Sequence, residues 1–293
     1  MKRKVAITIA VLVFLVALCV TVYPLISSIN SEKQQSVKYS EFNETLEKTS
    51  TAELEEERKK AQKYNKSITP GASPESNTDL EEYNKLLNLG SDGIMGYVNI
   101  EKLNIHLPIY HTADAKVLES GVGHLEFTSL PVGGESTHSV LTAHSGMASQ
   151  RLFSDLDILE KGDTFYLEVL GEKLYYKVQK ISTVLPYEID NLKIETGKDL
   201  VSLVTCTPFG VNTHRLIVTA ERIEVLEELT SSVNSDEAPR AQEKRSTWET
   251  EYLKAIFVGI GIFASVLILY ISVGFIKKKS KRRESSKSEK NFV

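Results

Sequence analysis

The sequence predicts a mainly-β extracellular domain, built as a closed or nearly closed barrel, between two membrane-spanning helices. From Ile94 onward apolar residues recur at every second position in seven or more segments with little helix between them, which is typical of a barrel. Two uncharged runs, residues 5–23 and 255–276, are long enough as helices to cross a bilayer. Basic clusters lie at the outer end of each run, so we expect a two-pass protein of the cell membrane with both termini cytoplasmic.

The composition excludes several classes of protein. The chain has 293 residues, of which 41% are apolar and 25% charged, an ordinary globular balance. A net charge of −4 and a pI near 6.0 give no basic field, so we expect no nucleic-acid partner. Two cysteines are too few for a disulfide scaffold, and a mean hydropathy of −0.16 excludes a polytopic membrane protein.

The first uncharged run has two alternative interpretations. A cleaved signal peptide should end in a small-x-small site, but this run ends in Val-Thr-Val-Tyr-Pro at residues 20–24, which favours an uncleaved anchor. The bulky Leu18 before Cys19 argues against a lipoprotein cleavage site.

Shifts in composition divide the chain into segments. Residues 31–68 have a polar helical pattern with a capping box at Ser50 and Glu53, followed by a turn-rich loop at 69–79 and a short amphipathic helix at 79–88. We expect six parts: a cytoplasmic stub and anchor (1–29), a helical stalk with a short lid region (30–82), the β-barrel (83–225), a charged linker (226–252), the second transmembrane helix (253–276) and a basic cytoplasmic tail (277–293).

Alternating segments define the expected strands, which span 95–100, 106–111, 139–144, 164–170, 173–183, 200–206 and 214–223. Between two of them, Leu170-Gly171-Glu172-Lys173 matches a two-residue hairpin with glycine at its first central position, which suits a type II′ turn.

Cys206 is the only cysteine in the exported region, because Cys19 lies inside the first uncharged run. Such a cysteine is an inert core residue, an intermolecular link or a reactive thiol. Thr207-Pro208 should end its strand and leave the thiol at the rim of the barrel, which favours the reactive interpretation. A reactive thiol still needs activation to the thiolate.

His144 and His214 are comparable candidates for that activation by spacing alone, although a single histidine is more often a satisfied core or surface residue. His214 and Arg215 are neighbours on one strand, so their side chains point to opposite faces and one of them at most addresses the thiol. Arg215 would supply fixed donors to an oxyanion, or it forms an ordinary surface salt bridge. None of the histidines has the spacing of a zinc site.

Several long segments of the sequence resemble the sortase family. LVTCTPFGVNTHRL (203–216) resembles the sortase signature, in which a cysteine strand is followed by an arginine on the next strand, and TAHSG (142–146) resembles the sortase histidine motif. MGYVNIEKLNIHLPIYH (95–111) and GVGHLEFTSLPVGGESTHSVLTAHSG (121–146) are similar to class C sortases, the pilus-assembling group. The resemblance covers residues 83–223, and the two-anchor layout fits the same class.

The resemblance implies an eight-stranded sortase β-barrel in which Cys206, His144 and Arg215 are catalytic, without a cofactor or metal. It implies transpeptidation at an LPXTG-like sorting signal: a thioacyl-enzyme forms at Cys206, and the lysine amine of another pilin subunit resolves it, so that pili polymerise on a Gram-positive type of cell surface. Thr205 and Thr207, which flank the nucleophile, are expected to shape the substrate groove, the alternative being that both simply satisfy strand ends. The expected partners are pilin subunits that carry the sorting signal, and the membrane.

Other functions remain open at this point. A housekeeping sortase would transfer the acyl group to a cell-wall precursor amine, and water as acceptor would make the protein a thiol protease. A barrel without activity that binds or scaffolds surface proteins is a different class of function.

One departure from class C sortases concerns the lid, which usually covers the catalytic cysteine with an Asp-Pro-aromatic motif. Pro70 and Pro74 follow Thr69 and Ser73 here, and no such motif precedes Tyr83. Either the lid is short and permissive, or another residue plugs the site. We expect a more exposed thiol at Cys206 than a lidded relative would have.

Overall fold

The computed structural model describes residues 2–68, 80–145, 150–188, 190–208, 210–224, 254–270 and 272–273. The chain divides into two compact units, one of Met1–Val22 with Asp236–Val293 and one of Tyr23–Ser235. The second unit contains all the strands that the structure describes.

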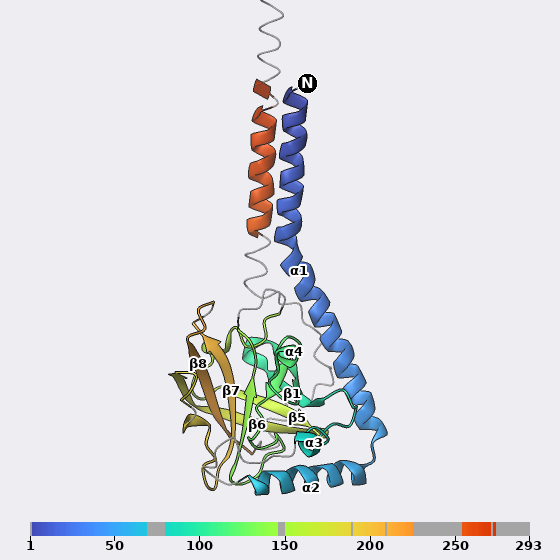
Figure 1. The fold of residues 1–293 in the computed structure, drawn as a ribbon, viewed down its shortest axis with the longest axis vertical. Coiled ribbons are helices and arrows are strands. Elements are labelled where there is room, and N and C mark those ends of the chain that lie inside the picture. The colour runs from blue at the N-terminus through green and yellow to red at the C-terminus, as the bar shows by residue number, and fades with distance from the viewer. Residues whose placement is uncertain are drawn as a thin grey trace, which may run out of the picture. The chain divides into compact units, whose positions relative to one another are not determined.

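Eight strands form a closed barrel, as the sequence and the resemblance predict (Figure 1). Their order around the barrel is β1-β2-β3-β4-β7-β8-β6-β5, and the pairing of β1 with β5 closes it. The strands are β1 (Ile94–Ile100), β2 (Ile105–Tyr110), β3 (Val122–His124), β4 (Thr137–Thr142), β5 (Thr164–Val169), β6 (Glu172–Val184), β7 (Asp199–Thr207) and β8 (His214–Arg222).

The pairing is mixed. β3 runs parallel to β2 and β7 runs parallel to β4, whereas the other neighbours are antiparallel. The β4–β7 pair joins residues about 60 positions apart, for example Thr142 with Val204. Because the parallel strands end at the same edge, the residues that follow β4 lie next to the end of β7.

Some details of the barrel differ from the prediction. β3 has three residues, too few for a period of two to be recognised. The β5–β6 turn has Leu170 and Gly171 as its central residues, since Val169 pairs with Glu172, and both have positive φ (51° and 77°). Two positive φ angles are typical of a type I′ turn, which matches the twist of the flanking strands, so the predicted type II′ turn is wrong.

The two faces of β7 meet different surroundings. Val201 and Leu203 belong to the main hydrophobic core, whereas Val204 packs with Val140 and Ile217 in a smaller cluster. Because side chains alternate along a strand, Cys206 shares the face of Val204 and points away from the main core. Because of this alternation, the thiol is available to a ligand while neighbouring side chains of β7 pack in the core.

Two long helices precede the barrel, and the second of them packs against its main core. α1 spans Lys2–Lys48 and α2 spans Thr51–Ser67, and the predicted capping box between Ser50 and Glu53 is present. Ala61 of α2 is fully buried in the main core, and the buried Asn65 side chain binds both backbone groups of Leu130, at 2.7 and 3.1 Å. These contacts make α2 part of the compact unit that contains the barrel.

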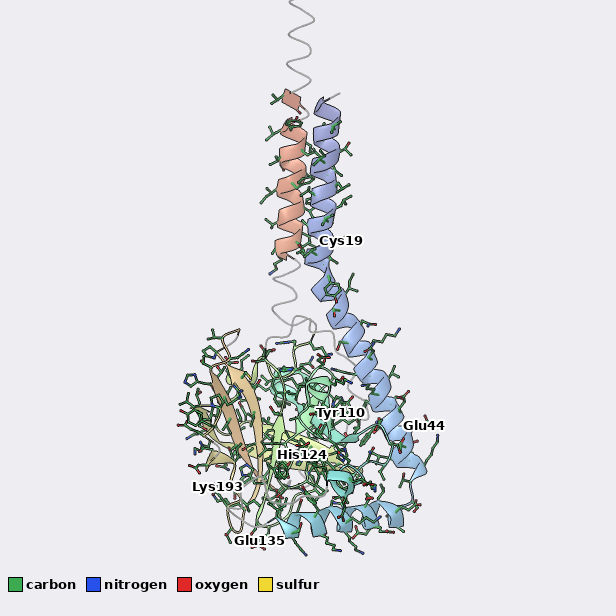
Figure 2. The ribbon with its side chains drawn as sticks, viewed as in Figure 1. Cys19, Glu44, Tyr110, His124, Glu135 and Lys193 are labelled. Atoms are coloured by element: carbon green, nitrogen blue, oxygen red, sulfur yellow. The ribbon has the colours of Figure 1, made fainter. Side chains whose placement is uncertain are left out.

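The short helix α3 (Leu80–Tyr83) precedes the first strand. The short helical segments that join described strands are η1 (Glu101–Leu103), α4 (Ala115–Leu118), η2 (Leu156–Ile158) and η3 (Asp190–Leu192). The buried Tyr83 hydroxyl of α3 lies 2.8 Å from Nδ1 of His124, whose Nε2 lies 2.8 Å from the carbonyl oxygen of Ser129 (Figure 2 labels His124). This pattern corresponds to a neutral ring that donates from Nε2, and burial lowers the pKa of His124 to about 4.

Residues 254–270 form a further helix. Among the described residues, no helix combines the length and the apolar character that a bilayer crossing requires. The predicted lid loop (69–79), linker (226–252) and basic tail (277–293) lie outside the described residues. The two membrane anchors therefore stay predictions.

Acid should destabilise the domain through His106 of β2, whose ring packs edge-on against Tyr39 of α1 at 4.4 Å and near Tyr97 at 5.1 Å between centroids. Burial, with a smaller contribution from Lys173, lowers the pKa of His106 to about 4. An unfolded histidine binds its proton below about pH 6.5. The unfolded state therefore holds more protons between pH 6.5 and 4, and stability is lost as the pH falls through that window, by up to about 3 kcal/mol.

Urea unfolding of the wild type and of His106→Gln at pH 7.5 and 4.5 tests this expectation. The variant loses packing at both pH values. The informative quantity is therefore the change in the free energy of unfolding of each protein between the two pH values. We expect the wild type to lose more stability than the variant on acidification. An equal loss in both proteins would show that His106 does not carry the effect.

Candidate active site

The strand pairing at the end of β7 places Cys206 directly opposite Arg215 of β8. Directly opposite residues of an antiparallel pair project from the same face of the sheet, so the thiol and the guanidinium share one side. Both residues are half-buried, and Cys206 is a free thiol. β7 continues only to Thr207, before Pro208, so the thiol lies one residue from the end of its strand, as the sequence predicts.

The Arg215 guanidinium is oriented by the turn before β8. Its Nη1 donates to the carbonyl oxygens of Asn212 (3.3 Å) and His214 (3.1 Å). These two bonds leave the Nε and Nη2 donors for another acceptor. Among the described residues Arg215 forms no ion pair, which disfavours the alternative of an ordinary surface salt bridge.

His144 follows β4, two residues beyond its last pairing position, although the predicted strand included it. The backbone bond from Ala143 N to the carbonyl oxygen of Val204 (3.2 Å) extends the contact of this segment with β7. Continuing the Thr142–Val204 register by two residues places His144 alongside Cys206. The half-buried histidine therefore lies at the same edge of the barrel as the thiol.

His214 is placed differently. It pairs with Thr207, so its side chain projects from the face opposite that of Arg215 and Cys206. Its Nδ1 lies 2.9 Å from the Thr213 hydroxyl. Spacing alone leaves both histidines as candidates for activating the thiol, and the strand register favours His144.

A small pocket with a volume of about 50 Å³ lies at this end of the barrel, and Cys206 lines it. Both predicted substrate-binding threonines also line it. Thr205 is 3% exposed and donates its hydroxyl to the carbonyl oxygen of Ala143 (2.8 Å), which ties β7 to the segment of His144. Thr207 is half-buried and, at the end of the strand, is the more accessible of the two.

The structure adds lining residues that the sequence did not single out. The described lining of the pocket is Ser145, Phe153, Ser154, Asp157, Thr205, Cys206, Thr207 and Leu216. The Ser145 hydroxyl donates to the carbonyl oxygen of Cys206 at 2.6 Å. Ser145 lies inside the histidine motif, directly after His144, and was a recognisable neighbour, whereas nothing in the local pattern around Asp157 distinguishes it from a surface carboxylate.

Chemically, this arrangement offers a nucleophile, a proton carrier and a fixed cation at one edge of the barrel. A thiol needs a partner that removes its proton, and a tetrahedral oxyanion needs donors that already face it. Within the part of the chain that the structure describes, no group of three or more His, Cys, Asp or Glu side chains could hold a metal ion.

Comparisons with known proteins point to one family. The sortase domain family matches residues 98–223. Sortase C-1 from Actinomyces oris is 44% identical, with 59% of this chain and 99% of that chain covered and a TM-score of 0.55. Sortase C1 from Streptococcus agalactiae is 42% identical, with 63% and 97% covered and a TM-score of 0.61. Sortase A of Streptococcus agalactiae is 29% identical over 179 residues, 60% of this chain and 70% of the relative.

An eight-stranded barrel with a strand-end cysteine opposite an arginine, together with these matches, defines a cysteine transpeptidase: the chain belongs to the sortase family. Its similarity to the sortase C structures identifies it further as a class C sortase.

Proposed function

We propose that this class C sortase cleaves an LPXTG-like sorting signal and joins the acyl fragment to a lysine amine of a pilin subunit, so that pili are polymerised. The observation that carries the proposal is the placement of Cys206 opposite Arg215 at a pocket beside the segment of His144. The similarity to sortase C structures, one of which refers to pilin substrate specificity in Streptococcus pneumoniae, supports the pilin as substrate.

The first half of the proposed reaction forms the thioacyl-enzyme. The Cys206 thiolate attacks the threonine carbonyl carbon of the sorting signal, and the oxyanion that develops accepts hydrogen bonds from Arg215. The imidazolium of His144 then donates its proton to the departing glycine amine as the C–N bond breaks. Removing one such oxyanion donor typically costs about 3 kcal/mol of transition-state stabilisation.

The second half transfers the acyl group. An amine attacks the thioester carbon, the thiolate leaves, and the neutral imidazole of His144 takes up the proton of the amine. In the proposed function the amine is a pilin lysine. A cell-wall precursor amine or water would give the housekeeping and hydrolytic alternatives.

We also propose that both ends of the chain anchor the catalytic domain at the outer face of a cell membrane, with both termini cytoplasmic. The uncharged runs at residues 5–23 and 255–276, with a basic cluster at the outer end of each, support this placement.

Intact-mass measurement of the full chain in detergent tests the catalytic proposal. After incubation with an LPXTG-type peptide, we expect a mass increase equal to the acyl fragment, and no increase in Cys206→Ala. Adding a peptide with only a lysine side-chain amine should then discharge the adduct faster than a peptide with only an α-amine. If a small thiol reagent modifies Cys206 while no sorting peptide acylates it, the transpeptidase proposal is wrong for this class of peptide.

A further inference from the structure

The pocket at Cys206 contains one carboxylate that the mechanism above does not use. Asp157 lies in η2 and lines the pocket together with Cys206. Among the described lining residues it is the only acidic or basic side chain, the others being serine, threonine, cysteine, leucine and phenylalanine. A single negative charge in a small pocket beside a nucleophile favours a cationic ligand group.

The charge of Asp157 is not neutralised by its described neighbours. Asp155, two residues earlier, forms an ion pair with Arg151, whereas Asp157 forms no ion pair with any described cation. Asp157 is exposed, so a ligand can reach its carboxylate. The two aspartates of the same short segment therefore have different roles. Asp155 stabilises the loop, and Asp157 remains available to a ligand.

The segment that carries Asp157 is fixed relative to the catalytic groups. Phe153 and Leu156 are both fully buried in the main core. The backbone N–H of Phe153 donates to the carbonyl oxygen of His144 at 3.1 Å. These contacts hold the carboxylate at one wall of the pocket while Cys206 forms part of the same lining.

A lysine acceptor arrives with the charge that this pocket favours. The ε-amine of lysine has a reference pKa of about 10.4, so at neutral pH it enters as an ammonium ion. The thioester that awaits it carries no net charge. Apart from Asp157, no described residue that lines the pocket is acidic or basic, and the Arg215 guanidinium opposite Cys206 lies outside this lining. A carboxylate accepts stronger, charge-assisted hydrogen bonds from an ammonium than from the neutral N–H and O–H groups of the acyl fragment.

We infer that Asp157 binds the ammonium group of the acceptor lysine and thereby determines the specificity of the second half of the reaction for cationic amines. This inference rests on the proposed function and deepens it.

In the step itself the ammonium first loses one proton to solvent water, and the free amine attacks the thioester carbon. As the new C–N bond forms and the C–S bond breaks, the neutral imidazole of His144 takes the second proton of the nitrogen, which leaves the Cys206 thiolate and the imidazolium. Asp157 accepts a hydrogen bond from the nitrogen before attack and takes no proton in the balance.

The test compares two amines on a preformed thioacyl-enzyme of the full chain in detergent. Nα-acetyl-lysine methylamide is the cationic probe, and hydroxylamine is a nucleophile that is uncharged at neutral pH. We expect Asp157→Asn to lower the second-order rate constant for the lysine probe by about three- to tenfold, a size typical of one partly exposed charge interaction. The rate with hydroxylamine and the rate of thioacyl-enzyme formation should stay unchanged.

Glu160→Gln is the matched control. Glu160 is an exposed acid three residues after Asp157, and its Oε2 lies 4.0 Å from Nζ of Lys102. It is not among the described lining residues of the pocket, so its replacement should change the rate with neither amine. Equal slowing of both amines by Asp157→Asn would indicate a structural role, and no slowing of either would indicate no role. Both results overturn the inference and leave the proposed function intact. A wild type that forms no thioacyl-enzyme would overturn the proposed function and this inference with it.

Discussion

Replacing Arg215 by alanine is expected to slow thioacyl-enzyme formation by about 100- to 1,000-fold, the usual cost of removing one oxyanion donor. The reason is its place directly across the strand pair from Cys206, where the guanidinium has donors that its two bonds to Asn212 and His214 do not use. Rapid-quench intact-mass measurement gives the rate of adduct formation without dependence on the acceptor.

Arg215→Lys separates charge from geometry. An ammonium keeps the positive charge but lacks the planar set of donors, so we expect it to recover only part of the loss. The control is His214→Ala, which changes the adjacent side chain on the other face of the same strand and should leave the rate within a few-fold of the wild type. If Arg215→Ala acylated as fast as His214→Ala, Arg215 would have no part in the reaction.

His144→Ala should slow turnover by about 100- to 10,000-fold, the range that general acid–base catalysis contributes. The departing glycine amine and the incoming lysine amine both exchange a proton at this position in the proposed mechanism. We therefore expect both thioacyl-enzyme formation and its discharge by the lysine probe to slow. Both rates are measured by intact mass, with urea unfolding as a check that the barrel remains folded.

The same measurement on His214→Ala decides between the two histidines. The register places His144 alongside Cys206 and turns His214 toward the face of Thr207. A larger loss in His214→Ala than in His144→Ala would assign proton transfer to His214 and contradict the placement inferred from the strands.

Much of the fold follows from local patterns along the chain. A period of two identified seven of the eight strands, because each of them is long enough to show the alternation. The three-residue β3 was missed for lack of length. The turn at Leu170 and Gly171 was assigned one residue too late, because a glycine suits several turn positions and only the pairing of Val169 with Glu172 fixes which one it occupies.

In the helical region before the barrel, too, only the local features could be predicted from the sequence. The capping box of α2 and its ion pairs between Glu55 and Lys59 and between Glu56 and Lys60 are local, and the structure confirms them. That α2 would bury Ala61 in the core and bind Leu130 through Asn65 could not be predicted, because both contacts join segments far apart in the sequence.

The reactive groups of the domain can be identified from local sequence: a single cysteine between the two uncharged runs, placed before a proline that ends its strand, with histidines and an arginine near the ends of other strands. Which of these groups meet depends on how the strands pair around the barrel. The parallel pairing of β4 with β7 brings the segment of His144 to Cys206, and the register of β7 with β8 selects Arg215 rather than His214. The tertiary structure also places Asp157 in the wall of the pocket. The physical reason is that strand register depends on how the whole core is packed, and a shift of one residue would turn every side chain of a strand to the other face.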